Sequence, residues 1–321
     1  MFELREIAVS LTFFVLVYCL LSALVAVAWP SLKLLRTTER KLTHLFFALR
    51  VLPLVASVVV TFVFVVPSFQ LLEPRSLTVD EGIGAMPLAL GICALLLIAC
   101  GCWRVIAAHT QTSRLVTHWL EGAHRLPVDA AACTPAHTLT FRSRREAPPL
   151  TLVGFRNPTV LVSESTLALL TPDELRVALK HELAHMQSRD NLKKLLFRFC
   201  PFPGMAKLED AWSQAAELAA DDASVSTLND ALDLAAALVK LSRLIPVEAA
   251  PVCTVGFVTG SISARVARLL AWNETEAGKA RQTRMRPWHA IPPVLGALLC
   301  VTATYGPVLA LTHEMTEWLV R

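Results

Sequence analysis

Four long apolar stretches constrain the fold of this chain more than any other feature. A helix that crosses the hydrocarbon core of a bilayer needs about 20 predominantly apolar residues. The chain meets this requirement at about residues 7–29, 45–69, 83–106 and 291–311. Charged residues make up only 17% of the 321 residues, below the roughly 25% of soluble domains. We therefore expect an α-helical membrane protein with four transmembrane helices.

Charged residues and a proline lie in or near the first two stretches and bear on their assignment as membrane spans. The first is too long for the apolar part of a cleavable signal peptide, and Glu3 and Glu6 precede it. The second contains Pro53, which favours a kink, and Arg50, whose long side chain can snorkel to the interface. We interpret both stretches as membrane spans.

The distribution of basic residues predicts how the spans are oriented. The loop after the first stretch holds four basic residues, and residues 279–286, before the fourth stretch, hold another four. The loop after the second stretch holds only Arg75, beside three acidic residues. Because Lys and Arg accumulate on the cytoplasmic side, we expect the first loop and the long third loop inside the cell. Both termini are then outside.

The long third loop has the length of one folded domain. A short helix at 113–125 and three β-like runs at 137–143, 149–155 and 158–163 come first. Four helical patterns follow, at 172–199, 207–226, 230–244 and 262–272. Strands followed by helices indicate an α+β domain. The expected division is 1–106 for three spans, 107–288 for the cytoplasmic domain, and 289–321 for the fourth span with a short outer tail.

A metal-binding motif lies on the first of the longer helices. Residues 171–174, TPDE, form a capping box with proline at the first helical position. In HELAH, His181 and His185 are one turn apart on one face, so both imidazoles can bind one ion. Glu182 is rotated by about 100° and lies beside the ion, where it can accept a proton from water. This HExxH arrangement is typical of zinc peptidases, although chance on an amphipathic helix also produces it.

A third ligand is needed, because catalytic zinc binds three protein side chains and keeps one position open. In AELAADDASV, Glu217 and Asp221 are four residues apart and share a helix face. Pro201, Pro203 and Gly204 permit the chain to return toward the histidines. We assign Glu217 as the third ligand and Asp221 as a carboxylate that binds a ligand histidine. The alternative is a solvated acidic face.

The order of these motifs resembles the BlaR/MecR-type membrane metallopeptidases of bacteria. Three segments carry the resemblance: FRNPTVLVSESTLALLTPDELRVALKHELAHMQSRDN, AELAADDASV and SARVARLL. It implies a gluzincin-like fold, Zn²⁺ bound by His181, His185 and Glu217, Glu182 as the catalytic residue, and a place in the bacterial inner membrane. It also implies that Arg265, in SARVARLL, supports the transition state or the structure.

The chain departs from those antibiotic sensors in two respects. Only about ten residues follow the fourth stretch, so we expect no extracellular penicillin-binding domain. The chain also contains no Ser-x-x-Lys acylation motif. We therefore do not expect direct β-lactam sensing.

The leading hypothesis is a zinc endopeptidase that cleaves a cytoplasmic regulatory protein, such as a DNA-binding repressor. Membrane protein quality control of the HtpX type is an alternative, and so is a signalling scaffold with a purely structural zinc. The expected partners are the lipid bilayer and a cytoplasmic protein substrate, without direct nucleic acid binding. Homo-oligomer formation is left open.

Two apolar segments of the domain each admit two interpretations. The run TVLVS, residues 159–163, is either an edge strand that pairs with an extended peptide or a core strand. The run LLFRFCPF, residues 195–202, either rests on the inner membrane face or forms a buried helix end.

Overall fold

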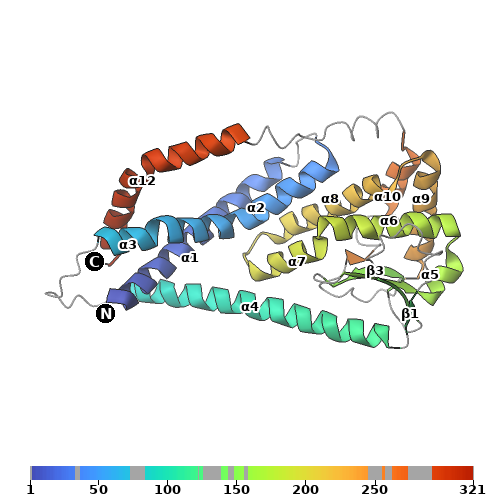
Figure 1. Ribbon diagram of the computed structural model, residues 1–321, viewed down its shortest axis with the longest axis horizontal. Coiled ribbons are helices and arrows are strands. Elements are labelled where there is room, and N and C mark those ends of the chain that lie inside the picture. The colour runs from blue at the N-terminus through green and yellow to red at the C-terminus, as the bar shows by residue number, and fades with distance from the viewer. Residues whose placement is uncertain are drawn as a thin grey trace.

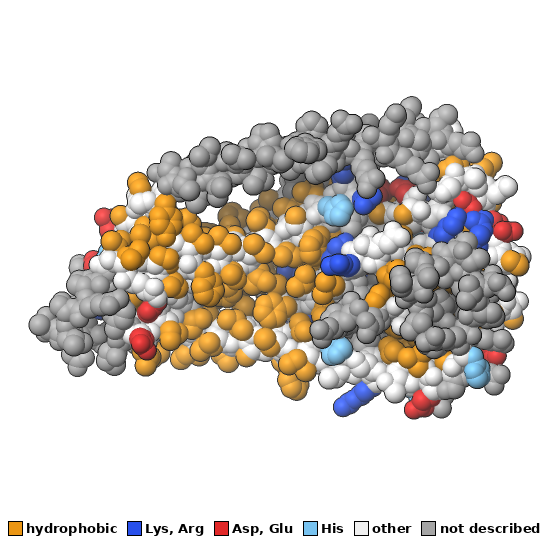
Figure 2. All heavy atoms as spheres, in the orientation of Figure 1, with side chains coloured by type: hydrophobic (Ala, Val, Ile, Leu, Met, Phe, Trp, Pro, Cys, Tyr) orange, Lys and Arg blue, Asp and Glu red, His pale blue; other side chains and the backbone are white. Residues whose placement is uncertain are grey.

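The computed structural model describes residues 2–32, 37–72, 84–121, 123–125, 139–143, 148–154, 158–244, 255–256, 262–273 and 291–320. The protein is elongated, with a helical bundle at one end and an α/β domain at the other (Figure 1). Hydrophobic side chains gather on the surface of the bundle, whereas charged side chains gather around the domain (Figure 2). This division matches what a bilayer and an aqueous phase each require.

Three helical segments of the bundle are long and apolar enough to cross a membrane, namely Glu3–Ser31, Glu39–Leu72 and Ala85–Leu120. The first is α1 (Phe2–Leu32). The second consists of α2 (Glu39–Val60), the π-helical turn η1 (Thr61–Val65) and α3 (Val66–Leu72). The third is α4 (Ala85–Leu120). The expected fourth span lies within α12 (Ile291–Val320), which is helical, and its membrane insertion stays a prediction.

The irregular turn of the second span lies next to Pro67. Pro53 lies inside α2, and the expected kink there stays a prediction. Proline has no N–H group, so Pro67 leaves the carbonyl of Val63 without its usual α-helical partner. The hydroxyl of Tyr305, on α12, donates to this carbonyl at 3.1 Å. Val63 lies within the π-helical turn η1, where the backbone hydrogen bonds depart from the α-helical pattern. The contact therefore holds α12 against the second span.

The third span is longer than the sequence predicts. We expected it to end near residue 106 and a separate helix to follow at 113–125, but α4 continues without a break to Leu120. Its far end packs on the sheet, because Trp119 lies in a buried cluster with Val153 and Leu161. One helix thus connects the apolar bundle directly to the α/β domain (Figure 1).

The sheet has the strand order β1-β2-β4-β3-β5. Its strands are β1 (His124–Arg125), β2 (Leu139–Ser143), β3 (Leu150–Val153), β4 (Thr159–Ser163) and β5 (Val255–Gly256). The central strand β4 pairs in parallel with β2 and antiparallel with β3. Both of its edges are therefore occupied, and the edge-strand interpretation of residues 159–163 was wrong; β4 is a core strand.

Six helices follow among the described residues of the domain. They are α5 (Glu164–Leu169), α6 (Pro172–Ser188), α7 (Asp190–Phe199), α8 (Ala206–Ser224), α9 (Leu228–Ser242) and α10 (Ile262–Leu270). The predicted capping box begins α6: the Thr171 hydroxyl accepts from the Glu174 amide, and the Glu174 carboxylate accepts from the Thr171 amide. Side chains of β3, β4, α6 and α9 share one buried apolar cluster, which fixes α6 against the sheet.

The predicted helix at 172–199 is two helices. Arg189 has a φ of 55° and a left-handed conformation, so it ends α6 and begins α7. A non-glycine residue adopts this conformation at a cost of roughly 1–2 kcal/mol. The surrounding contacts offset that cost, because the break brings Asp190 and Asn191 into buried positions.

The end of α7 is buried against the bundle. Phe197 and Cys200 are both buried, which favours the buried helix end among the interpretations of residues 195–202. Arg50 of α2 does not snorkel to the interface, contrary to our expectation. Its guanidinium is 3% exposed and donates to the Glu209 carboxylate and to the backbone carbonyls of Phe197 and Cys200.

Gly101 permits α4 to approach the same helix end. A Cβ atom at this position would lie 2.3 Å from the carbonyl oxygen of Phe199, a backbone atom that has little freedom to move. We expect Gly101→Ala to lower the free energy of unfolding by about 1–3 kcal/mol, as overpacking does. Thermal unfolding of the detergent-solubilised protein measures this loss. The matched control is Gly306→Ala on α12, since a Cβ there meets nothing within 4 Å. Equal melting temperatures for the two variants would contradict the expectation.

Candidate metal centre

Three buried side chains from two helices meet at one point in the domain. α6 supplies His181 and His185, and α8 supplies Glu217. One donor atom from each lies within 4.8 Å of the others, and this is the metal-binding group found among the described residues. Both histidines are fully buried and Glu217 is 2% exposed. Burial of three convergent donors is costly without a cation to bind them.

The distances between the donor atoms suit zinc. Tetrahedral zinc with bonds of about 2.0–2.1 Å places neighbouring ligand atoms about 3.3–3.4 Å apart. The Nε2 atoms of His181 and His185 are 3.1 Å apart. Each lies 3.6 Å from a carboxylate oxygen of Glu217, His181 from Oε2 and His185 from Oε1. These three donors therefore fit a zinc ion, and they leave a fourth position for water or substrate.

A carboxylate lies next to the Nδ1 atom of each histidine, on the side of the ring away from the metal centre. Nδ1 of His181 lies 3.0 Å from Oδ1 of Asp221, and Nδ1 of His185 lies 2.8 Å from Oδ2 of Asp190. A carboxylate accepts hydrogen bonds and does not donate them, so Nδ1 carries the proton in both rings. Each Nε2 then keeps a lone pair directed at the centre. This is the arrangement that raises the basicity of histidine ligands in zinc sites.

Arg265, from α10, contacts both acidic residues of the cluster that lie on α8. Its guanidinium donates from Nε to Oδ2 of Asp221 at 2.8 Å and from Nη2 to Oδ1 at 2.6 Å. It also donates from Nη1 to Oε2 of Glu217 at 2.8 Å. Burial acts to raise the pKa of Asp221, but the hydrogen bonds from His181 and Arg265 lower it to about 2. Both acidic groups therefore remain anionic.

Glu182 lies beside this cluster and is fully buried. Neither of its carboxylate oxygens makes a well-formed hydrogen bond within the described part of the chain. Burial raises the pKa of this carboxyl to about 8, although nearby His181 acts in the opposite direction. A buried carboxylate without a partner is unfavourable for stability alone. Such a group next to three metal-binding side chains is suited to proton transfer.

The structure brings together all six of the residues that the sequence singles out: His181, Glu182, His185, Glu217, Asp221 and Arg265. For Asp190 the sequence indicates ion pairing at the end of the helix, and the resemblance a role in supporting the site, but neither names His185 as its partner. The signal was present in SRDN, directly after the helix that carries the histidines, but only the left-handed Arg189 turns this carboxylate back toward His185.

The segment from β3 to the start of α8 contains the histidine pair, Glu182 and Asp190. Residues 152–209 match the model of Peptidase family M48. This is a family of zinc metallopeptidases. The match ends before Glu217, so it does not bear on the third donor, which the sequence predicts and the geometry brings to the two histidines. Among curated proteins, none matches the chain significantly.

Asp190 provides a test of the site that does not depend on activity. We expect Asp190→Asn to weaken zinc binding by about 10-fold or more, since the variant keeps the shape but loses the charge that orients His185. Competition with a chromogenic chelator measures the affinity. The matched control is Asp210→Asn, an exposed aspartate on α8. The orienting role is wrong if both variants bind zinc as the wild type does.

Proposed function

We propose that this protein is an integral membrane zinc-dependent endopeptidase that cleaves a cytoplasmic regulatory protein. The observation that carries the proposal is the buried group of His181, His185 and Glu217, with the buried carboxyl group of Glu182 beside it. The match of residues 152–209 to Peptidase family M48 supports the same chemistry.

The residues divide the work of peptide hydrolysis between them. His181, His185 and Glu217 would hold the zinc ion. When bound, zinc supplies Lewis acidity, which polarises a peptide carbonyl and makes water more acidic. Glu182 accepts a proton from water and delivers it to the departing amine. Asp221 and Asp190 keep the two imidazoles in the correct tautomer, and Arg265 keeps Glu217 and Asp221 in place.

The proposed substrate is on the cytoplasmic side. Basic residues gather in the first loop and before α12, as they do on the inner face of bacterial membranes. The start of α1 and the end of α12 lie at the end of the bundle away from the domain (Figure 1). This agrees with both termini being outside. The resemblance to BlaR/MecR-type peptidases favours a repressor-like regulatory protein as the substrate.

Two alternatives predict different behaviour. A quality-control peptidase of the HtpX type shares the chemistry but cleaves damaged membrane proteins. A signalling scaffold with structural zinc needs no carboxylate beside its ligands, and structural sites close the fourth position with Cys or His. The buried Glu182 therefore argues against the scaffold.

A comparison of protein termini in cells distinguishes these functions. Wild type and Glu182→Ala are expressed in the same bacterial host, and new N-termini are identified in the cytosolic and membrane fractions. A regulatory peptidase produces a few wild-type-specific cuts in a soluble protein. Quality control produces many cuts in membrane proteins. Identical termini in the two strains, with zinc bound in both proteins, would refute the peptidase function.

A further inference from the structure

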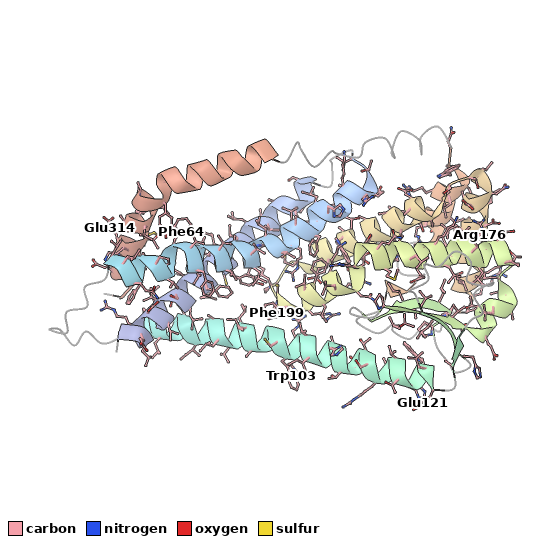
Figure 3. The ribbon with its side chains drawn as sticks, viewed as in Figure 1. Phe64, Trp103, Glu121, Arg176, Phe199 and Glu314 are labelled. Atoms are coloured by element: carbon pink, nitrogen blue, oxygen red, sulfur yellow. The ribbon has the colours of Figure 1, made fainter. Side chains whose placement is uncertain are left out.

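All three membrane-capable segments contact one short connection in the domain. This is the α7–α8 turn, which we define as residues 200–205 together with the last residue of α7, Phe199. From α1, the hydroxyl of Tyr18 donates to the carbonyl of Pro201 at 3.1 Å. From α4, Gly101 packs against the backbone of Phe199; Figure 3 shows Phe199 at the end of α7 that faces the bundle.

The strongest of these contacts comes from α2. Arg50 donates from Nε to Oε1 of Glu209 at 2.8 Å and from Nη2 to the carbonyl of Phe197 at 3.2 Å, and Nη2 also reaches the carbonyl of Cys200. Its guanidinium lies 5.6 Å from the centre of the Phe197 ring. One side chain thus holds the last turn of α7 and the first turn of α8 together. The planar fork of donors in a guanidinium is suited to binding acceptors on two helices at once.

Both helices that Arg50 joins carry groups of the metal centre. α7 begins at Asp190, which orients His185. α8 carries Glu209 near its start and Glu217 eight residues later, about 12 Å along the axis. Helices transmit displacement of one end to the other because they are stiff. The distance between α7 and α8 therefore affects the distance and orientation of the Glu217 carboxylate relative to His181 and His185.

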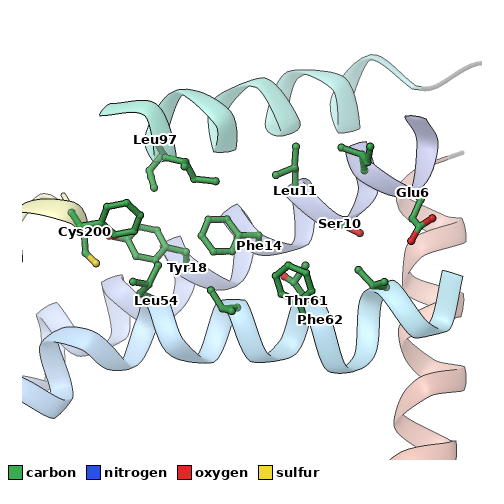
Figure 4. A pocket seen from close by; sticks show the side chains of 15 residues that line it. Glu6, Ser10, Leu11, Phe14, Tyr18, Leu54, Thr61, Phe62, Leu97 and Cys200 are labelled. Carbon is green, nitrogen blue, oxygen red and sulfur yellow. The ribbon is translucent and has the colours of Figure 1, made fainter. Parts of the chain in front are cut away.

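Packing on the membrane segments fixes only part of the turn. Phe197 and Met205 share a buried apolar cluster with residues of α1 and α2. A cavity of about 390 Å³ separates the spans and reaches Phe199 and Cys200. Figure 4 shows Tyr18 and Cys200 at one end of this cavity and Glu6 at the other. Interiors are normally packed without such voids, and packing then holds each element in one place. Where the cavity reaches the turn, the directional hydrogen bonds of Arg50 hold Phe197 and Cys200 in addition to the packing.

We propose that Arg50 is a positioning residue of the metal centre, through which the second membrane segment sets the spacing of α7 and α8 and thereby the geometry of the three zinc ligands. The inference rests on the proposed zinc-binding function. It assigns to a residue of a membrane segment an effect on a site in the α/β domain, and it predicts that metal binding itself, not only folding, depends on this contact.

The test uses the full-length protein in lipid nanodiscs. Arg50→Met is compared with Arg40→Met, which removes an exposed arginine from the same helix. We expect Arg50→Met to weaken zinc binding by about tenfold, as loss of outer supporting groups does. We also expect the visible absorption spectrum of the Co²⁺-loaded protein to change, because this spectrum reports coordination geometry. Arg40→Met keeps the wild-type affinity and spectrum.

A purely structural role for Arg50 gives a different result. In that case Arg50→Met melts at a lower temperature but binds zinc and Co²⁺ as the wild type does, which overturns the proposal. If Arg50→Met does not fold, Arg50→Lys is the deciding variant. Lysine keeps the charge, but its donors sit on one nitrogen and do not reproduce the planar fork that spans both helices. The proposal then requires an intermediate affinity and an altered Co²⁺ spectrum, and wild-type values would refute it.

The two proposals fail in different ways. A wild-type protein that binds zinc but cleaves no protein refutes the peptidase function, while the affinities of the Arg50 variants still decide the positioning role. A wild-type protein that binds no zinc overturns both.

Discussion

Glu182→Gln is expected to lower kcat for peptide hydrolysis by about 10²–10⁴-fold, the usual contribution of a general acid–base group. Glutamine has nearly the same shape as glutamate but cannot take a proton from water. Glu182 is not one of the three convergent donors, so zinc affinity is expected to stay at the wild-type level. The loss should therefore appear in kcat while the metal content remains unchanged.

The measurement uses the purified protein in nanodiscs with a fluorescent unfolded protein as substrate. Zinc content is determined on the same samples. Asp173→Asn serves as the matched control, because it removes an exposed carboxylate from the same helix. An active Glu182→Gln protein with full zinc content would show that another group transfers the proton.

Arg265→Met is expected to be the most destabilising change in the domain. The guanidinium is 3% exposed and makes three charge-assisted hydrogen bonds to Asp221 and Glu217. Its removal leaves two buried carboxylates without their cation, and breaking a buried pair in this way costs about 3–5 kcal/mol. For a domain of this size, the melting temperature should fall by on the order of 10 °C.

A nearby arginine provides the control. Arg268, one turn further along α10, pairs with Asp222 at 2.8 Å, but both side chains are more than a third exposed. Exposed pairs contribute only about 0–1 kcal/mol, so Arg268→Met should melt close to the wild type. Arg265→Lys keeps the charge but not the planar guanidinium. Its melting temperature should lie between those of Arg265→Met and Arg268→Met. Equal melting temperatures for Arg265→Met and Arg268→Met would contradict the role that we assign to Arg265.

The local chemistry of the site could be predicted because it depends on short-range rules. The capping box fixes where α6 begins, and helical spacing places His181 and His185 on one face. The same spacing pairs Glu217 with Asp221. The strands β2, β3 and β4 also appear where β-like runs occur in the sequence. These features require knowledge of only a few neighbouring residues.

What escaped prediction depends on contacts between distant segments. The break at Arg189 has no sequence signal, since arginine rarely adopts a left-handed conformation. Arg50 has the appearance of an interfacial residue until α7 and α8 are placed beside it. The length of α4 was underestimated because its apolar character ends before its helix does. Hydropathy indicates where a membrane ends, not where a helix ends.

The position of Arg265 in the chain has a consequence for biogenesis. Arg265 follows Asp221 by 44 residues, and at about 5–20 residues per second a ribosome needs roughly 2–9 s to add them. During this interval Asp221 and Glu217 have been synthesised, but Arg265, which donates to both carboxylates in the full chain, has not. The metal centre is therefore completed late in synthesis, after the first three hydrophobic helices have emerged. A nascent chain truncated before α10 should not retain zinc.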